Sequence, residues 1–251
     1  MSKYGYIPKY HIPTVDEINQ LKNGSWSDNP ELVNKLGNHR FDLSYLDLTG
    51  AYLYGIDLSS AIINHTNLSY SYINDANLSY ACIVGSNFSF GNLENTSFAE
   101  CMLKDSKFVH SNLKDSNFRD GSLECADLSY ANLNKTSFRY AYLENANLYK
   151  AIMCNTDLIG ADLENANLRS TNLGDSIFSI EDLSQIILQH QYLLNINFKD
   201  EKILNKCIND LDYGILTFEK MINLLVKNTP FSTNDLINLS CNDIYKLLLT
   251  L

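Results

Sequence analysis

The sequence predicts an all-β solenoid, a rod of stacked four-sided coils with a cap at each end. Three observations carry this prediction. A large apolar residue recurs at every fifth position, a mostly small residue stands two positions before it, and the phenylalanines of the series are separated by multiples of ten. The series starts at Leu43 and ends at Phe178, with 28 consecutive matches and no insertion. Such internal repetition is the signature of a solenoid.

A period of five fits neither an α-helix nor a long strand. It fits a short extended step followed by a turn. Alternation along the extended step places the large residue and the small residue inside the coil. The other three residues face outward, and they include the Ser, Asn, Asp and Gly residues that suit turns. Each five-residue unit therefore forms one side of a coil, and the turn type stays open.

The phenylalanines indicate the number of sides. With an even number they share one opposed pair of sides, whereas with three sides they scatter over all of them. Four sides of five residues give seven coils over residues 41–180 and a rod of roughly 34 Å at the ~4.8 Å strand spacing. The phenylalanines of the series are Phe88, Phe98, Phe108, Phe118, Phe138 and Phe178.

The repeats carry the pattern Ala-(Asp/Asn)-Leu-x-x, as in Ala76-Asn77-Leu78, Ala126-Asp127-Leu128 and Ala161-Asp162-Leu163. This pattern resembles the pentapeptide-repeat proteins over residues 41–180. The resemblance implies a right-handed quadrilateral β-helix. It also implies two further expectations, since some relatives bind type II topoisomerases such as DNA gyrase and some dimerise through a helical segment after the β-helix.

Caps are expected at both ends, because a stacked coil leaves an apolar cross-section and unpaired edge groups. In residues 1–40, Thr14-Val15-Asp16-Glu17 is a capping box that opens a helix ending at Gly24. Asn29-Pro30-Glu31 opens a second helix, which Gly37 is predicted to close. We expect side chains of the cap to cover the first coil. The candidates are Tyr4, Tyr6, Tyr10 and Trp26.

Residues 181–251 lose the five-residue period and gain helical spacing. Helices are predicted near 181–194, 200–211, 217–228 and 233–250. This α-helical region is either a C-terminal cap with its own small core or a homodimer interface.

Composition restricts the function classes. The net charge is −10 and the pI near 4.9, so direct nucleic-acid binding is not expected, because it needs clustered Lys and Arg. No stretch approaches the ~20 apolar residues of a spanning helix, and no signal peptide is recognisable, so we expect a cytoplasmic protein without membrane contact. Six widely spaced cysteines without a Cys-x-x-Cys pair fit reduced thiols.

No motif of enzyme chemistry occurs: no HExxH, no Gly-rich phosphate loop and no nucleophile elbow. A rod filled with Leu and Phe also offers no cavity that perturbs the pKa of a catalytic carboxylate. The sequence predicts no catalytic residue, no cofactor and no metal site. Cys82, Cys101 and Cys125 fall on one side of the rod, where structural thiols are favoured over a metal site.

Assigning each pentapeptide to a side separates the charges. The side that begins with residues 41–45 carries Asp42, Asp105, Glu124, Glu144, Asp162 and Glu164 against Lys104 alone, a net charge of −5. Five of these form a candidate partner-binding acidic face, which we define as Asp105, Glu124, Glu144, Asp162 and Glu164. The alternative interpretation is a solvated surface that opposes aggregation.

The next side has a net charge of +1 and a row of aromatic rings at equivalent outward positions. We define the aromatic strip as Tyr70, Phe90, His110 and Tyr130. Stacked rings stabilise a sheet surface, and an exposed row of them is also a candidate for protein binding.

The sequence favours a non-enzymatic scaffold or protein-interaction module, with a partner that it does not identify. The alternative is a DNA-mimicking topoisomerase (gyrase) inhibitor or quinolone-protection protein, as the resemblance implies. B-DNA of 34 Å holds roughly 20 charges, against a net −8 on this rod, which disfavours mimicry. A third hypothesis places an enzyme or ligand-binding activity in residues 181–251.

Overall fold

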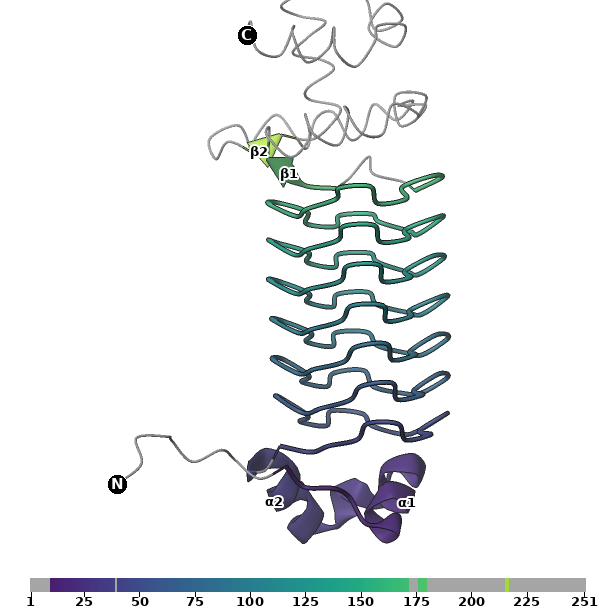
Figure 1. Cartoon of the computed structure of the whole chain (residues 1–251), viewed down its shortest axis with the longest axis vertical. Coiled ribbons are helices and arrows are strands. Elements are labelled where there is room, and N and C mark those ends of the chain that lie inside the picture. The colour runs from purple at the N-terminus through teal and green to yellow at the C-terminus, as the bar shows by residue number, and fades with distance from the viewer. Residues whose placement is uncertain (1–9, 39, 172–175, 180–214, 217–251) are drawn as a thin grey trace, which may run out of the picture.

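The computed structural model describes residues 10–38, 40–171, 176–179 and 215–216, which form a rod with a helical cap at its N-terminal end (Figure 1). Parallel β-bridges join residues twenty apart, from Asp42 and Ile62 at the first coil to Asp157 and Ile177 at the last described coil. Each coil therefore has four sides of five residues, as the phenylalanine spacing predicts. The rod is a β-helix solenoid.

The five-residue period sets the inside and the outside of each coil. The first and third residues of each pentapeptide are buried almost throughout, and the others lie at the surface. At the corners a turn closes with bonds such as Ala51 N–H to the Leu48 carbonyl at 3.0 Å. The fifth residue adopts a left-handed φ, 61° at Tyr70 for example, as the third position of a type II turn requires.

The core is a stack of large apolar side chains on each side, with phenylalanines in register in the middle coils. Phe88 stacks on Phe108 at 5.1 Å, and Phe98 stacks on Phe118 at 4.7 Å on the opposite side. The two stacks meet edge to face, as Phe98 and Phe108 do at 5.7 Å. Both arrangements are favoured geometries for aromatic pairs. The predicted sharing of one opposed pair of sides is confirmed.

Many buried hydroxyls donate to the backbone of a neighbouring coil. Thr66 donates to the Leu43 carbonyl at 2.7 Å, and Thr96 donates to the Ile73 carbonyl at 2.9 Å. Small hydroxyl residues therefore serve at the inward position without leaving an unpaired polar group.

The N-terminal cap comprises α1 (Val15–Asn23), the 3-10 helix η1 (Ser25–Asp28) and α2 (Pro30–Asn38). The predicted capping box of Thr14 and Glu17 is present, and Gly24 ends α1 with φ 83°. The prediction that Gly37 closes the second helix is wrong by one residue, because α2 continues through Gly37 to Asn38.

The cap is bonded directly to the first coils. Trp26 Nε1–H donates to the Tyr52 carbonyl at 2.9 Å. His11 forms a parallel bridge with Phe41, which extends the ladder by one strand before the first coil. The cap thus covers the edge that the repeats leave open. Of the aromatic residues expected to cover the first coil, Tyr4 and Tyr6 lie outside the described residues.

At the other end, β1 (Phe178–Ser179) pairs antiparallel with β2 (Ile215–Leu216). This pairing places residues 215–216 beside the last coil. In the sequence these residues lie between the helices predicted near 200–211 and 217–228. The helices predicted near 181–194, 200–211, 217–228 and 233–250, and with them the dimer interface, lie outside the described residues. Among the residues described, no helix has the length and apolar character to cross a membrane.

Candidate interaction surfaces

The acidic face lies on one side of the rod, and its glutamates occupy equivalent positions in consecutive coils. Glu124, Glu144 and Glu164 are each twenty residues apart, so parallel pairing stacks them along the axis. Oxygen atoms of Glu144, Asp162 and Glu164 lie within 4.8 Å of one another. The charge of Asp162 raises the pKa of Glu144, and desolvation, Glu164 and Glu124 add to the rise. The carboxylates therefore repel one another.

The outer members of the acidic face are placed differently. Asp105 occupies an exposed corner, and its backbone amide donates to the Glu124 carbonyl oxygen at 3.0 Å. The Glu124 carboxylate accepts a hydrogen bond from the Ser122 hydroxyl. The structure thus brings three of the five predicted residues into one cluster, couples Glu124 to that cluster by charge and leaves Asp105 at its border.

The aromatic strip forms one continuous ladder. Tyr70 stacks on Phe90 at 5.0 Å, Phe90 on His110 at 5.2 Å, and His110 on Tyr130 at 4.6 Å, with planes within 19° of parallel. The ladder continues beyond the predicted residues, because Lys150 Nζ lies 5.5 Å from the Tyr130 ring centre. The rings support one another and still expose their edges.

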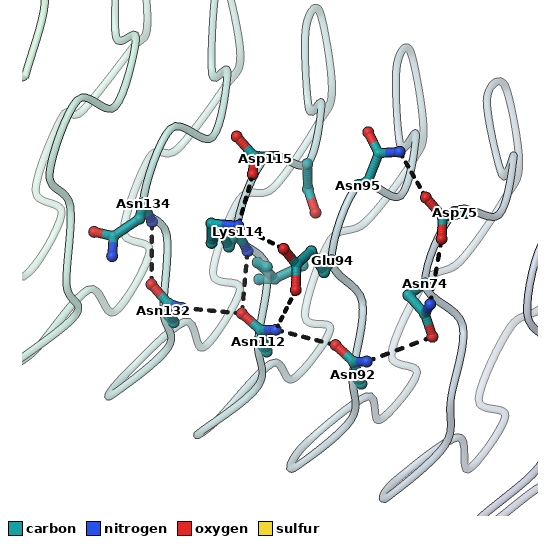
Figure 2. A network of polar contacts seen from close by, with 12 residues as sticks. Asn74, Asp75, Asn92, Glu94, Asn95, Asn112, Lys114, Asp115, Asn132 and Asn134 are labelled. Atoms are coloured by element: carbon teal, nitrogen blue, oxygen red, sulfur yellow. Dashed lines mark hydrogen bonds and ion pairs between the residues drawn. The ribbon is translucent and has the colours of Figure 1, made fainter.

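A polar network on a third side was missed by the sequence reasoning (Figure 2). The Asn132 amide donates to Asn112 at 3.0 Å, and Asn112 donates to Asn92 at 3.0 Å. Lys114 bridges Glu94 at 2.6 Å and Asp115 at 3.0 Å. The sequence contains a signal for this network, because its asparagines are spaced twenty residues apart, the length of one coil.

This network borders an open hollow of about 740 Å³. Its lining residues are Asn74, Asp75, Glu94, Asn95 and Asp115. Asn95 donates to Asp75 at 2.7 Å, so these polar groups bond mainly to one another. The hollow is a solvated surface feature in which Lys114 pairs with two of the three carboxylates and Asn95 bonds to the third.

The three thiols that share a side occupy different stations. Cys101 is buried, and burial raises its pKa to about 12. Cys82 donates to Asn64 Oδ1 at 3.2 Å, and Cys125 is exposed at a corner. Within the described residues, the one His, Cys, Asp or Glu group with converging ligand atoms is the cluster of Glu144, Asp162 and Glu164.

The fold and its surfaces define a solenoidal repeat protein with solvent-facing ladders of like side chains. The model of the family "Pentapeptide repeats" matches eight copies, over residues 42–79, 81–120, 122–158 and 136–175, more than half of the chain. The chain belongs to the pentapeptide-repeat family, and the β-helix is accordingly right-handed.

Solved structures of the family resemble parts of the chain. The pentapeptide repeat protein Rfr23 from the cyanobacterium Cyanothece 51142 is 31% identical, over 36% of this chain and 58% of that one, with a TM-score of 0.29. HetL from Nostoc sp. strain PCC 7120 is involved in heterocyst differentiation regulation. It is 25% identical over 56% of this chain and 65% of that one, with a TM-score of 0.27. The chain thus spans less than two thirds of either protein.

QnrB1, a plasmid-mediated fluoroquinolone resistance protein, is 15% identical over 60% of this chain and 84% of that one, with a TM-score of 0.33. A comparison with curated protein sequences found no match.

Proposed function

We propose that this protein is a non-enzymatic interaction module whose acidic face binds a basic surface of a partner protein. The observation that carries the proposal is the coupling of Glu144 to Asp162, Glu164 and Glu124, which raises the pKa of Glu144. A basic partner relieves this repulsion on binding. The binding free energy therefore includes the relief of the carboxylate repulsion that is present in the free protein.

The polar network on the third side provides an internal comparison. There Lys114 pairs with Glu94 and lowers the pKa of that carboxyl. On the acidic face, Lys104 is the one basic residue of the whole side, and it precedes Glu144 by two coils. The fold thus neutralises carboxylates on one side with a lysine and leaves them concentrated on another, as electrostatic complementarity to a basic partner needs.

The non-enzymatic part of the proposal is supported by the filling of the rod. The inward positions of the described coils hold Leu, Ile, Phe, Met and small residues, which are buried almost throughout. Catalytic sites need a concave pocket with converging polar groups. The described hollow at Asp75 and Glu94 is open and internally bonded.

The full architecture that we propose has seven coils over residues 41–180 and a helical region over 181–251. This region either caps the rod or joins two copies. Light scattering of the full chain at several concentrations separates the two outcomes by mass.

The test of the acidic face is a capture experiment with a matched control. The full chain and the triple variant Glu124→Lys, Glu144→Lys, Glu164→Lys are immobilised and exposed to a bacterial lysate at low and high salt. The control variant reverses the same number of charges on another side, at Asp57, Glu100 and Asp120. We expect proteins that the wild type and the control retain and that the triple variant and high salt release. Equal retention by all three baits contradicts the proposal.

A second candidate is a DNA-mimicking inhibitor of DNA gyrase. The feature that favours it is the regular spacing of Glu124, Glu144 and Glu164 along one edge of a rod. The test is gyrase supercoiling, with and without a quinolone, in the presence of wild type or the triple variant. Inhibition or protection that the triple variant loses supports mimicry, and no effect at micromolar protein removes it.

A further inference from the structure

The rings at the corners of the rod lean in one direction, toward the coil that follows. A Cβ built on Gly85 would lie 2.7 Å from Nδ1 of His65, one coil earlier, and a Cβ on Gly160 would clash with the ring of Tyr140. A Cβ on Gly50 meets nothing within 4 Å, although Tyr70 stands at the same station one coil later. Each ring therefore covers its successor and leaves its predecessor uncovered.

This polarity leaves one face of the first ring in the aromatic strip uncovered. Tyr70 stacks on Phe90 at 5.0 Å with its C-terminal face. Its other face looks toward the space above Gly50, which has no side chain to fill it. The Tyr70 side chain is 57% exposed. The result is a flat aromatic surface with room for one more planar group.

Cations already cover other ring faces of this rod. Lys150 Nζ lies 5.5 Å from the Tyr130 ring centre at the far end of the strip, and Arg119 Cζ lies 5.8 Å from the Tyr140 ring centre. A cation within about 6 Å of a ring centre is attracted by the ring quadrupole. The same chemistry is available at the uncovered face of Tyr70.

The pentapeptide that contains Gly50 also carries one carboxylate, that of Asp47. Asp47 precedes Gly50 by three residues, and hydrogen bonds from the hydroxyl and amide of Thr49 lower the pKa of its carboxyl. The positive charge of Lys22 lowers that pKa further. The whole chain has a net charge of −10, which draws basic partners.

We propose that the uncovered face of Tyr70, above Gly50, binds the guanidinium group of an arginine side chain supplied by a basic partner protein, with Asp47 as counter-charge. Arginine fits better than lysine, because the planar guanidinium stacks on a ring and extends the ladder. The inference rests on the proposed function, since it assigns the partner one specific anchor residue.

The test measures binding of two capped peptides, tetra-arginine and tetra-lysine, to the full chain by calorimetry. Two variants address the site. Tyr70→Leu removes the ring, and Gly50→Tyr places a ring on the uncovered face. The second substitution is tolerable in the backbone, since Tyr45 and Tyr70 hold the same left-handed conformation with φ of 63° and 61°.

Matched controls are Tyr80→Leu and Gly55→Tyr. Tyr80 is an exposed tyrosine at another corner of the same coil as Tyr70. Gly55 has φ 66°, open space around its Cβ and no ring in the following coil, where Asp75 stands. Circular dichroism and thermal melting confirm that each variant folds.

We expect tetra-arginine to bind more tightly than tetra-lysine, and both site variants to weaken tetra-arginine binding by about three- to tenfold, with both controls unchanged. Equal affinity of the two peptides, or equal affinity of site variants and wild type, overturns the proposal. The acidic-face triple variant separates the two proposals. If it alone weakens binding, the acidic face stands and the Tyr70 site falls.

Discussion

The imidazole of His65 occupies the space that a side chain at position 85 needs, since a Cβ on Gly85 would lie 2.7 Å from Nδ1. We predict that Gly85→Ala displaces His65 from its stack on Tyr45. It should cost at least about 1 kcal/mol more than Gly55→Ala, which shares the left-handed φ but meets open space. Urea unfolding measures both variants. Equal losses of unfolding free energy in the two variants would show that the His65 ring moves aside without a cost, contrary to this prediction.

The acid stability of the cap depends on Glu17. Burial raises the pKa of this carboxyl, but the Thr14 amide and the side chains of His11 and Lys35 outweigh burial and lower the pKa to about 2. A lowered folded pKa contributes stability that is present above the ordinary value of 4.5 and is lost as the pH falls toward 2.

Glu17→Gln should therefore cost about 2 kcal/mol at neutral pH and flatten the pH dependence between 4.5 and 2. Trp26, the one tryptophan of the chain, lies in the cap and reports its unfolding by fluorescence. Glu31→Gln is the control, because Glu31 pairs with Lys35 at the surface. An unchanged acid transition in Glu17→Gln would refute the role of the carboxylate.

The phenylalanine stacks should dominate the stability of the middle coils. Phe108 is fully buried and contacts Phe88, Phe98 and Phe118. Phe108→Ala should cost about 3–5 kcal/mol, whereas Phe90→Ala on the outer ladder should cost about 1 kcal/mol or less. Denaturant unfolding followed by circular dichroism tests the difference. Similar losses would contradict the assignment of inward and outward stacks.

Two partly exposed glutamates should respond in opposite directions to the loss of charge. The ionised form of Glu144 is disfavoured in the folded protein, because neighbouring carboxylates raise its pKa, so Glu144→Gln should raise the thermal midpoint at neutral pH. Lys114 lowers the pKa of Glu94, so Glu94→Gln should lower the midpoint. Both effects should shrink with added salt, which screens surface charges. Midpoint shifts of the same sign would contradict the charge assignment.

The repeat made most of the fold predictable from the sequence. The unbroken series from Leu43 defined the register, and the spacing of Phe88, Phe98 and Phe108 identified four sides, which the β-bridges confirm. Each pentapeptide is a local unit that contacts its neighbours through the same stations, so local pattern and global fold agree. The helix end at Gly37 was misplaced because a glycine near a helix end does not by itself stop the helix.

The surfaces were predictable only in part. The station of each outward residue follows from the register, which is why the glutamate and aromatic rows were found. The lean of the rings and the pairing of Lys150 with Tyr130 depend on side-chain rotamers, which the period does not determine. The contacts of His11 and Lys35 with Glu17 join separate segments of the cap, where no repeat relates one residue to another.

The most direct measurement on the acidic face is a carboxyl NMR titration of Glu144 in the free protein and in Asp162→Asn. Asparagine keeps an oxygen for the Glu164 amide, which donates to Asp162 at 3.0 Å, and removes the charge that acts most strongly on Glu144. We predict a Glu144 pKa above the ordinary 4.5 in the wild type and a fall toward 4.5 in the variant. A wild-type pKa at or below 4.5, or one that Asp162→Asn leaves unchanged, would contradict the account of an uncompensated acidic face.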